Sequence, residues 1–174
     1  FKPENMVRRK KVLITAGGTF EPIDTVRGIS NRSSGRTGSV IADCFYETGW
    51  DVTFVHSTSS IRPKNEPQHE SSFLTADELQ SEMMRLLKGV SFDACIHLAA
   101  VSDFSVDCVT DANESVLTTN EKLHTQDALN VYLKKRSKIL DTIKRYALNP
   151  EHLKLVAFKL THSADPAQRK KQVA

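Results

Sequence analysis

The chain alternates between short apolar runs and longer segments in which apolar residues recur every three or four positions. Short runs rich in valine, leucine and isoleucine are typical of buried strands, whereas the longer spacing is typical of helices with one apolar face. Strands are predicted at 12–15, 52–56, 94–98, 129–133 and 155–158. Helices are predicted at 38–48, 75–89, 139–146 and 166–174. Because strands and helices alternate, the pattern predicts an α/β fold with a three-layer, Rossmann-like, mostly parallel sheet.

Residues 104–128 interrupt this alternation. They are polar, poorly periodic and long for a simple connection, so we expect them to form a flap. Residues 1–174 are otherwise expected to form one nucleotide-binding domain. The helix pattern at 166–174 calls for a further strand, since parallel sheets rarely end on half a crossover, and we therefore expect the domain to continue beyond residue 174.

Candidate chemistry is concentrated between the first strand and the first helix. The strand breaks into Gly17 and Gly18, and Ser33-Ser34-Gly35 comes just before the helix pattern begins. Glycines and small hydroxyls beside a helix N-terminus can present backbone N–H groups to a phosphate. Taken singly, the two pieces are better explained as a turn and a helix cap. Their occurrence in one loop that also carries several arginines favours an anionic ligand.

Composition narrows the class of protein. The apolar and charged fractions, 39% and 26%, are ordinary for a globular domain, and no run approaches a membrane span. A net charge of +3 suits small anionic substrates but is too small to imply nucleic acid. Three cysteines without Cys-x-x-Cys spacing, together with a polar start, indicate a cytoplasmic protein in which Cys44 and Cys95 are buried reduced thiols.

Four motifs, in this order and spacing, resemble the phosphopantothenate–cysteine ligase family, also called phosphopantothenoylcysteine synthetase. The first joins Gly-Gly-Thr at 17–19, Val-Arg at 26–27 and Asn-Arg-Ser-Ser-Gly at 31–35. The others are Ala-Ala-Val-Ser-Asp-Phe at 99–104, Glu-Lys-Leu at 121–123 and Phe-Lys-Leu at 158–160. The last motif has the form associated with stand-alone ligases, which lack the flavin-dependent decarboxylase half. A flavoprotein label would be inherited from the fused enzymes, and no flavin is predicted.

The resemblance implies a role for each matching residue. Asn31 would orient the acyl-nucleotide for its second step, and Lys122 would assist the first. The substrate site would include Arg27, Asn31, Ala99, Ala100 and Asp103. The nucleotide site would include Gly17, Gly18, Ser33, Gly35, Gly38, Lys122 and Phe158. Arg27 would reach the substrate phosphate of a neighbouring subunit, which implies a homodimer. Without the resemblance, the commoner roles are favoured: a loop carboxylate for Asp103, a solvated lysine for Lys122 and a core residue for Phe158.

The implied reaction joins 4'-phosphopantothenate and L-cysteine in coenzyme A biosynthesis, with CTP or ATP as co-substrate and Mg2+. Metal ligands are not assigned, and neither nucleic acid nor membrane is an expected partner. One alternative is a degenerate relative that binds nucleotide without catalysis. The other, a nicotinamide-dependent reductase, is weak because the sequence lacks both the glycine triplet and a Tyr-x-x-x-Lys pair.

Overall fold

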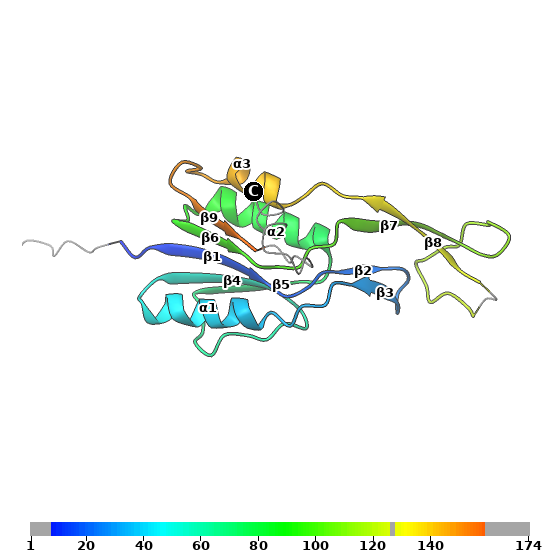
Figure 1. Ribbon diagram of the computed structural model, residues 1–174, viewed down its shortest axis with the longest axis horizontal. Helices are drawn as coiled ribbons and strands as arrows, with labels where there is room; N and C mark the ends of the chain where they lie inside the picture. The colour runs from blue at the N-terminus through cyan, green and yellow to red at the C-terminus, as the bar shows by residue number, and fades with distance from the viewer. Residues whose placement is uncertain (1–7, 126–127, 159–174) are drawn as a thin grey trace, which may run out of the picture.

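A computed structural model describes residues 8–125 and 128–158 (Figure 1). Five parallel strands form the central sheet, in the order β5-β4-β1-β6-β9. The strands are β1 (Lys11–Ala16), β4 (Asp51–Ser57), β5 (His69–Phe73), β6 (Ala94–His97) and β9 (Lys154–Ala157). Helix α1 (Arg36–Glu47) covers one face, and α2 (Ala76–Gly89) and α3 (Leu140–Tyr146) cover the other. The three-layer, mostly parallel α/β fold expected from the sequence is confirmed.

Both faces of the sheet are buried, which explains the apolar run Val12–Ile14 in the middle of β1. Leu13 packs with Leu79 and Met83 under α2, whereas Val12 and Ile14 pack in a second cluster under α1. Successive side chains of a strand point to opposite faces, so a sheet covered on both sides needs a continuous apolar run.

The strand order places a crevice beside the end of β1. From β1 the chain proceeds outward to β4 and β5, and then returns to the other side of β1 to form β6 and β9. The connections that follow β1 and β6 therefore diverge from neighbouring strand ends. In open α/β sheets, ligands bind at such a switch point, at the carboxyl ends of the strands.

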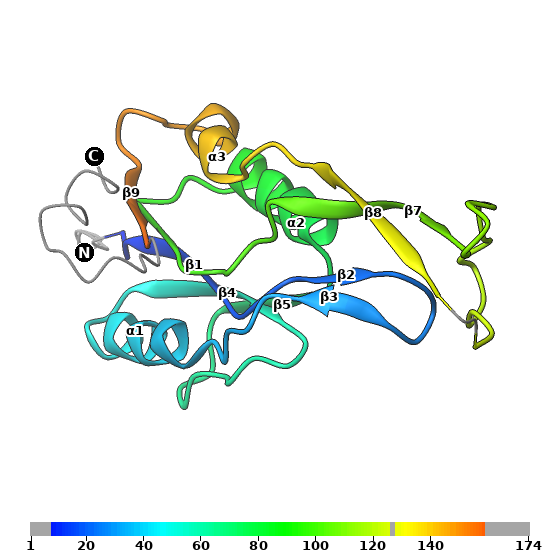
Figure 2. The ribbon, with the colours of Figure 1, turned by 45° about the vertical axis from the view of Figure 1, so that its right-hand side comes forward.

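Two antiparallel ribbons extend from this end of the sheet. Strands β2 (Phe20–Pro22) and β3 (Gly28–Ser30) form a short hairpin. Strands β7 (Phe104–Thr110) and β8 (Asn130–Lys135) form a longer ribbon, which we call the arm together with the described residues between them (Figures 1 and 2).

The arm corrects two predictions. The segment expected to be an irregular flap contains β7, and the strand expected at 129–133 pairs with β7 rather than joining the central sheet. Polar Ser105 and Asp107 alternate with apolar residues along β7, because this ribbon is only partly buried. A search for buried parallel strands misses that pattern.

Smaller differences have the same origin. Strand β5 was not predicted, because only Phe73 of its five residues is buried. Cys44 was expected to be buried but is exposed, since α1 turns Gly38, Ser39 and Ala42 toward the sheet and Cys44 away from it. Cys95 is buried in β6, as expected. The helix predicted at 166–174 lies outside the described residues. Within the part of the chain that the structure describes, no helix is both long enough and apolar enough to cross a membrane.

Candidate functional site

The glycine pair after β1 brings Asn31 against the end of the sheet. Gly17 has a φ of +89°, which favours glycine, and a Cβ on Gly18 would lie 1.9 Å from the backbone oxygen of Asn31. The Asn31 N–H donates to the carbonyl of Thr19 at 3.0 Å. Only glycine at position 18 permits this approach, so the pair sets the position of Asn31.

The loop after β6 is joined to the same turn. The Ala100 N–H donates to Gly17 O at 2.8 Å, and the Thr19 N–H donates to Ala100 O at 3.1 Å. In addition, the Ser102 N–H donates to Thr19 Oγ1 at 3.0 Å. These bonds fix the two loops to each other, and residues that follow β1 and β6 line each of two cavities.

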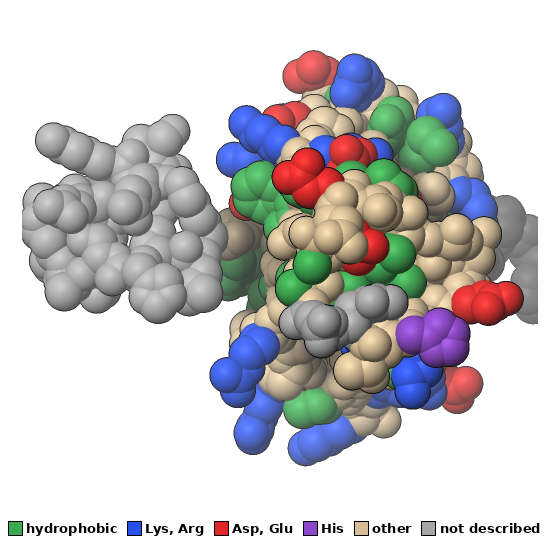
Figure 3. All heavy atoms as spheres, turned by 90° about the vertical axis from the view of Figure 1, so that its right-hand side faces the viewer, with side chains coloured by type: hydrophobic (Ala, Val, Ile, Leu, Met, Phe, Trp, Pro, Cys, Tyr) green, Lys and Arg blue, Asp and Glu red, His purple; other side chains and the backbone are tan. Residues whose placement is uncertain are grey.

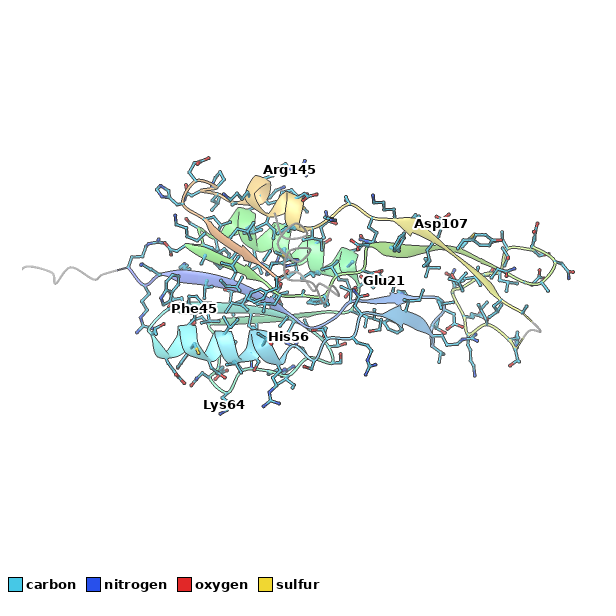
Figure 4. The ribbon with its side chains drawn as sticks, in the orientation of Figure 1. Glu21, Phe45, His56, Lys64, Asp107 and Arg145 are labelled. Atoms are coloured by element: carbon cyan, nitrogen blue, oxygen red, sulfur yellow. The ribbon has the colours of Figure 1, made fainter. Side chains whose placement is uncertain are left out.

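The first cavity, of about 310 Å³, holds two of the predicted substrate-site residues, Asn31 and Asp103. The backbone of Asp103 is fixed because its carbonyl accepts from the Arg136 N–H at 2.9 Å. Glu21, which is buried, accepts from the N–H of Ala76 at the start of α2 at 3.1 Å (Figure 4). The remaining residues that line this cavity are Ile29, Val101, Ser102, Phe104 and Leu133.

The second cavity, of about 210 Å³, lies at the N-terminus of α1. It is lined by four of the predicted nucleotide-site residues, Gly17, Gly35, Gly38 and Phe158, and by Ala16, Ser34, Arg36, Thr37 and Leu98. A Cβ on Gly38 would lie 2.6 Å from the Cβ of Ala16, so glycine lets the first turn of the helix reach β1. Helix α1 has no side-chain cap at Gly35, which leaves backbone N–H groups of its first turn for a ligand.

The Phe158 ring is presented at the rim of this second cavity. Phe158 is 57% exposed, and its N–H donates to His97 O at 3.3 Å at the end of the sheet. The alternative role as a core residue is therefore wrong. An exposed aromatic ring beside a helix N-terminus suits a ligand with both a phosphate and a flat base.

Other predicted residues line neither cavity. Ser33 lies beside the second cavity, which is lined instead by Ser34. Ala99 lies next to Ala100 in the joined loop, and its N–H donates to Thr15 Oγ1 at 3.2 Å. Arg27, at the tip of the β2–β3 hairpin, pairs with Asp24 of its own chain and also donates to Leu123 O at 2.9 Å. Lys122 is exposed on the arm, directly before that leucine.

Sequence reasoning missed several residues of the site. Thr19 and Ser102 belong to the motifs at 17–19 and 99–104, so the sequence contains a signal for their place in the site. Leu133 could not, because its approach to Phe104 depends on the antiparallel pairing of the arm. Among the described residues, no three His, Cys, Asp or Glu side chains cluster to form a metal site.

A buried histidine, His97, lies at the end of β6, next to the joined loops. His97 Nδ1 lies 2.8 Å from Thr15 Oγ1, and both residues are buried at the ends of neighbouring strands. Burial lowers the pKa of His97 to about 4 from 6.5, so its ring is neutral at pH 7.

We expect the free energy of unfolding to fall as the pH drops from about 6.5 to about 4, because the unfolded chain binds a proton that folded His97 refuses. The loss approaches about 3 kcal/mol at the lower pH. Urea titrations of wild type and His97→Asn between pH 7 and pH 5 would test this. Carboxylates contribute to the pH dependence of both proteins, so the difference between the two curves reports on His97. The variant is expected to lose less stability, and the exposed His152→Asn control should follow wild type. Parallel curves for His97→Asn and wild type would show that His97 does not contribute.

The fold and the two cavities define an α/β protein with a candidate phosphate site at a helix N-terminus. Residues 7–173 match the family model for the DNA/pantothenate metabolism flavoprotein C-terminal domain. The chain belongs to this family.

Curated relatives and solved structures agree with that membership. The coenzyme A biosynthesis bifunctional protein CoaBC of Methanocaldococcus jannaschii is 32% identical over 155 residues, which are 89% of this chain and 34% of that protein. Phosphopantothenate–cysteine ligase CAB2 of Saccharomyces cerevisiae is 40% identical over 81 residues, 45% of this chain and 22% of that protein. The chain thus spans about a third or less of the length of these relatives.

Among solved structures, the DNA/pantothenate metabolism flavoprotein from Streptococcus pneumoniae superposes with a TM-score of 0.76 at 26% identity, over 95% of this chain and 77% of that one. A Cab2 mutant in complex with phosphopantothenate-cysteine has the same fold, with a TM-score of 0.63 at 23% identity, over 94% of this chain and 68% of that one.

Proposed function

We propose that this chain carries the ligase site that joins 4'-phosphopantothenate and L-cysteine through an acyl-nucleotide, in coenzyme A biosynthesis. One observation carries the proposal: two cavities share the loops joined at Gly17 and Ala100, one at a helix N-terminus and one lined by Asn31 and Asp103. A reaction between a nucleotide α-phosphate and a carboxylate needs two such adjoining sites. Similarity to a relative named phosphopantothenate–cysteine ligase adds support.

In the first step, the carboxylate of 4'-phosphopantothenate attacks the α-phosphate of the nucleotide and expels pyrophosphate. Gly17, Gly35 and Gly38 and the free N–H groups of α1 would hold the phosphates, and Phe158 would stack on the base. Lys122 would neutralise charge that builds up on the α-phosphate and the leaving group. In the second step, the cysteine amine attacks the acyl carbon and expels the nucleoside monophosphate, with Asn31 holding the acyl group. Positioning and charge stabilisation suffice, so no protein nucleophile is needed.

The co-substrate is CTP or ATP, with Mg2+ as its counter-ion. Phosphate oxygens would supply most of the ligands of that ion, as is usual for Mg2+ bound with a nucleotide. Asp103, an exposed carboxylate on the first cavity, would contact a substrate amine, a hydroxyl or the metal. No flavin takes part in this chemistry.

A relative that binds nucleotide without catalysis is the competing proposal. The two differ in turnover, and pyrophosphate release separates them. The assay would supply CTP or ATP with 4'-phosphopantothenate, with and without cysteine, and would follow pyrophosphate and the amide product. Release that depends on 4'-phosphopantothenate supports the ligase. Nucleotide binding by calorimetry without release from either nucleotide, in a preparation that spans the whole domain, would instead support the binding protein.

We also propose that the ligase is a homodimer formed through the arm. A two-stranded ribbon is marginal in water unless another surface covers it. Apolar side chains are exposed on the arm and the β2–β3 hairpin, including Val26, Phe104, Val116, Tyr132 and Leu133. In the view along the arm toward the sheet, hydrophobic side chains are visible on this face, with Asp and Glu between them and Lys and Arg mostly nearer the edge (Figure 3). A second copy of the chain would bury them.

If Arg27 acts on the partner's substrate phosphate, subunits with different defects should complement each other. Mixing Arg27→Ala with Asn31→Asp should restore one of the two sites, to about half of the wild-type activity per heterodimer, because that site draws one intact residue from each subunit. Each variant alone is expected to be nearly inactive. If subunit exchange is shown by mass spectrometry and no activity returns, Arg27 acts within its own chain.

A further inference from the structure

Asp24, which no motif singled out, lies at the centre of a hydrogen-bond network that joins the β2–β3 hairpin to the arm. Its side chain has no exposed surface. At the hairpin tip, Oδ1 accepts from the N–H groups of Val26 at 2.8 Å and Arg27 at 2.7 Å, and Oδ2 accepts from Arg27 Nε at 2.9 Å. Oδ2 also accepts from the Leu123 N–H at 3.1 Å, from 99 residues further along the chain.

Leu123 is therefore held on both sides of its backbone. Asp24 accepts from its N–H, and Arg27 Nη2 donates to its carbonyl at 2.9 Å. The leucine side chain is only 8% exposed, although its neighbours Lys122 and His124 are exposed. The arm is thus anchored at the residue that follows Lys122, while the lysine side chain remains free to reach a ligand.

The Asp24 carboxylate remains ionised at neutral pH. Hydrogen bonds from Arg27, and then from the backbone N–H groups, hold the pKa of Asp24 well below its usual range in spite of burial. Charge-assisted bonds of this kind are stronger than neutral ones. The hydrogen-bond partners of the Asp24 side chain are Val26, Arg27 and Leu123, so its network joins the hairpin to the arm.

We infer that Asp24 is a positioning residue for Lys122: by binding the Leu123 N–H and orienting Arg27 onto the Leu123 carbonyl, it fixes the point from which Lys122 approaches the nucleotide. The inference rests on the proposed function for what Lys122 does, but the anchor itself is independent of that function. It also gives Arg27 a task within its own chain, whichever subunit's phosphate it contacts.

Trypsin provides a direct test, because it cleaves the Lys122–Leu123 bond, whose N–H is the group that Asp24 binds. In Asp24→Asn, an amide replaces the carboxylate that accepts all of these bonds. We expect cleavage at this bond to be at least about tenfold faster than in wild type, since local opening no longer has to break the anchor. Asp93→Asn is the matched control. Asp93, directly before β6, likewise accepts hydrogen bonds from an arginine, Arg8, and from a distant backbone N–H, that of Lys11. Its cleavage rate at Lys122 should equal that of wild type.

Wild-type protein offers a second measurement in case Asp24→Asn folds poorly. By hydrogen exchange, the Leu123 amide should exchange more slowly than those of the exposed Asn120, Glu121 and Lys122. Fast exchange at Leu123, or an unchanged cleavage rate in folded Asp24→Asn, would overturn the anchor.

Kinetics test the positioning role. In Asp24→Asn, kcat for pyrophosphate release should fall at least about tenfold with KM for the nucleotide within about twofold, because the phosphate cradle is untouched while the anchor that sets the approach of Lys122 is lost. Asp93→Asn should match wild type in both constants. Faster cleavage with an unchanged kcat would overturn the positioning role. If wild-type protein releases no pyrophosphate, the proposed function fails, and cleavage and exchange alone then decide the anchor.

Discussion

Replacing Lys122 with glutamine is expected to reduce pyrophosphate release by at least about a hundredfold while leaving the protein folded. The side chain is exposed on the arm, so it contributes little packing, and we expect the free energy of unfolding to change by less than about 0.5 kcal/mol. Glutamine keeps most of the length and the hydrogen-bonding capacity but lacks the charge. A loss of activity without a loss of stability would thus show that the positive charge of Lys122 is required. That charge would stabilise a transition state in which negative charge accumulates on phosphate oxygens.

Lys134→Gln is the matched control. Lys134 is another exposed lysine of the arm, on β8, and its ammonium group lies 3.2 Å from the carboxylate of Asp107. Pyrophosphate release by this variant should stay within about twofold of wild type, since a surface ion pair contributes little. Single-turnover release measured with saturating nucleotide would separate the first step from product release. A normal rate in Lys122→Gln would show that Lys122 is an ordinary solvated lysine with no part in the first step.

The sheet and the phosphate cradle could be predicted because local rules determine them. An apolar run covered on both faces indicates a buried strand, and glycine beside a helix start indicates close approach of the backbone. Gly17, Gly35 and Gly38 accordingly line one cavity, as expected for a shared ligand. The roles assigned to them remain predictions, as do those of Asn31, Asp103 and Lys122.

The arm and its anchor could not be predicted, because they depend on pairings between distant segments. The residues of β7 pair with residues 20 to 31 positions later in the chain, in a register that shifts between Val106 and Cys108. Asp24 meets Leu123 across 99 residues, and nothing in the residues around either one signals the other. The same dependence explains Arg27: the sequence suggested a phosphate contact, but not that its guanidinium also holds the arm of its own chain.

Replacing Asn31 with aspartate is expected to separate the two half-reactions. Asn31 lines the first cavity with Asp103, and its backbone is fixed by Thr19 and by the close approach of Gly18, so the substituted side chain should occupy the same position. Aspartate has nearly the same shape but cannot donate a hydrogen bond, and it adds a carboxylate to a cavity that Glu21 and Asp103 already line. Attack by the cysteine amine should therefore slow by about a hundredfold or more, since the hydrogen-bond donor proposed to hold the acyl group is replaced by a group that repels developing negative charge.

Under the proposed mechanism the first step does not need the Asn31 amide, so a burst of pyrophosphate should remain and the acyl-nucleotide should accumulate. Rapid quenching followed by mass spectrometry would detect the intermediate, and Asn113→Asp, at an exposed turn of the arm, is the control that should accumulate none. Thermal unfolding would confirm that both variants remain folded. A wild-type rate of product formation from cysteine would show that Asn31 plays no part in the second step. Loss of pyrophosphate release together with product would instead assign it to binding or to the first step, because an intermediate that never forms cannot accumulate.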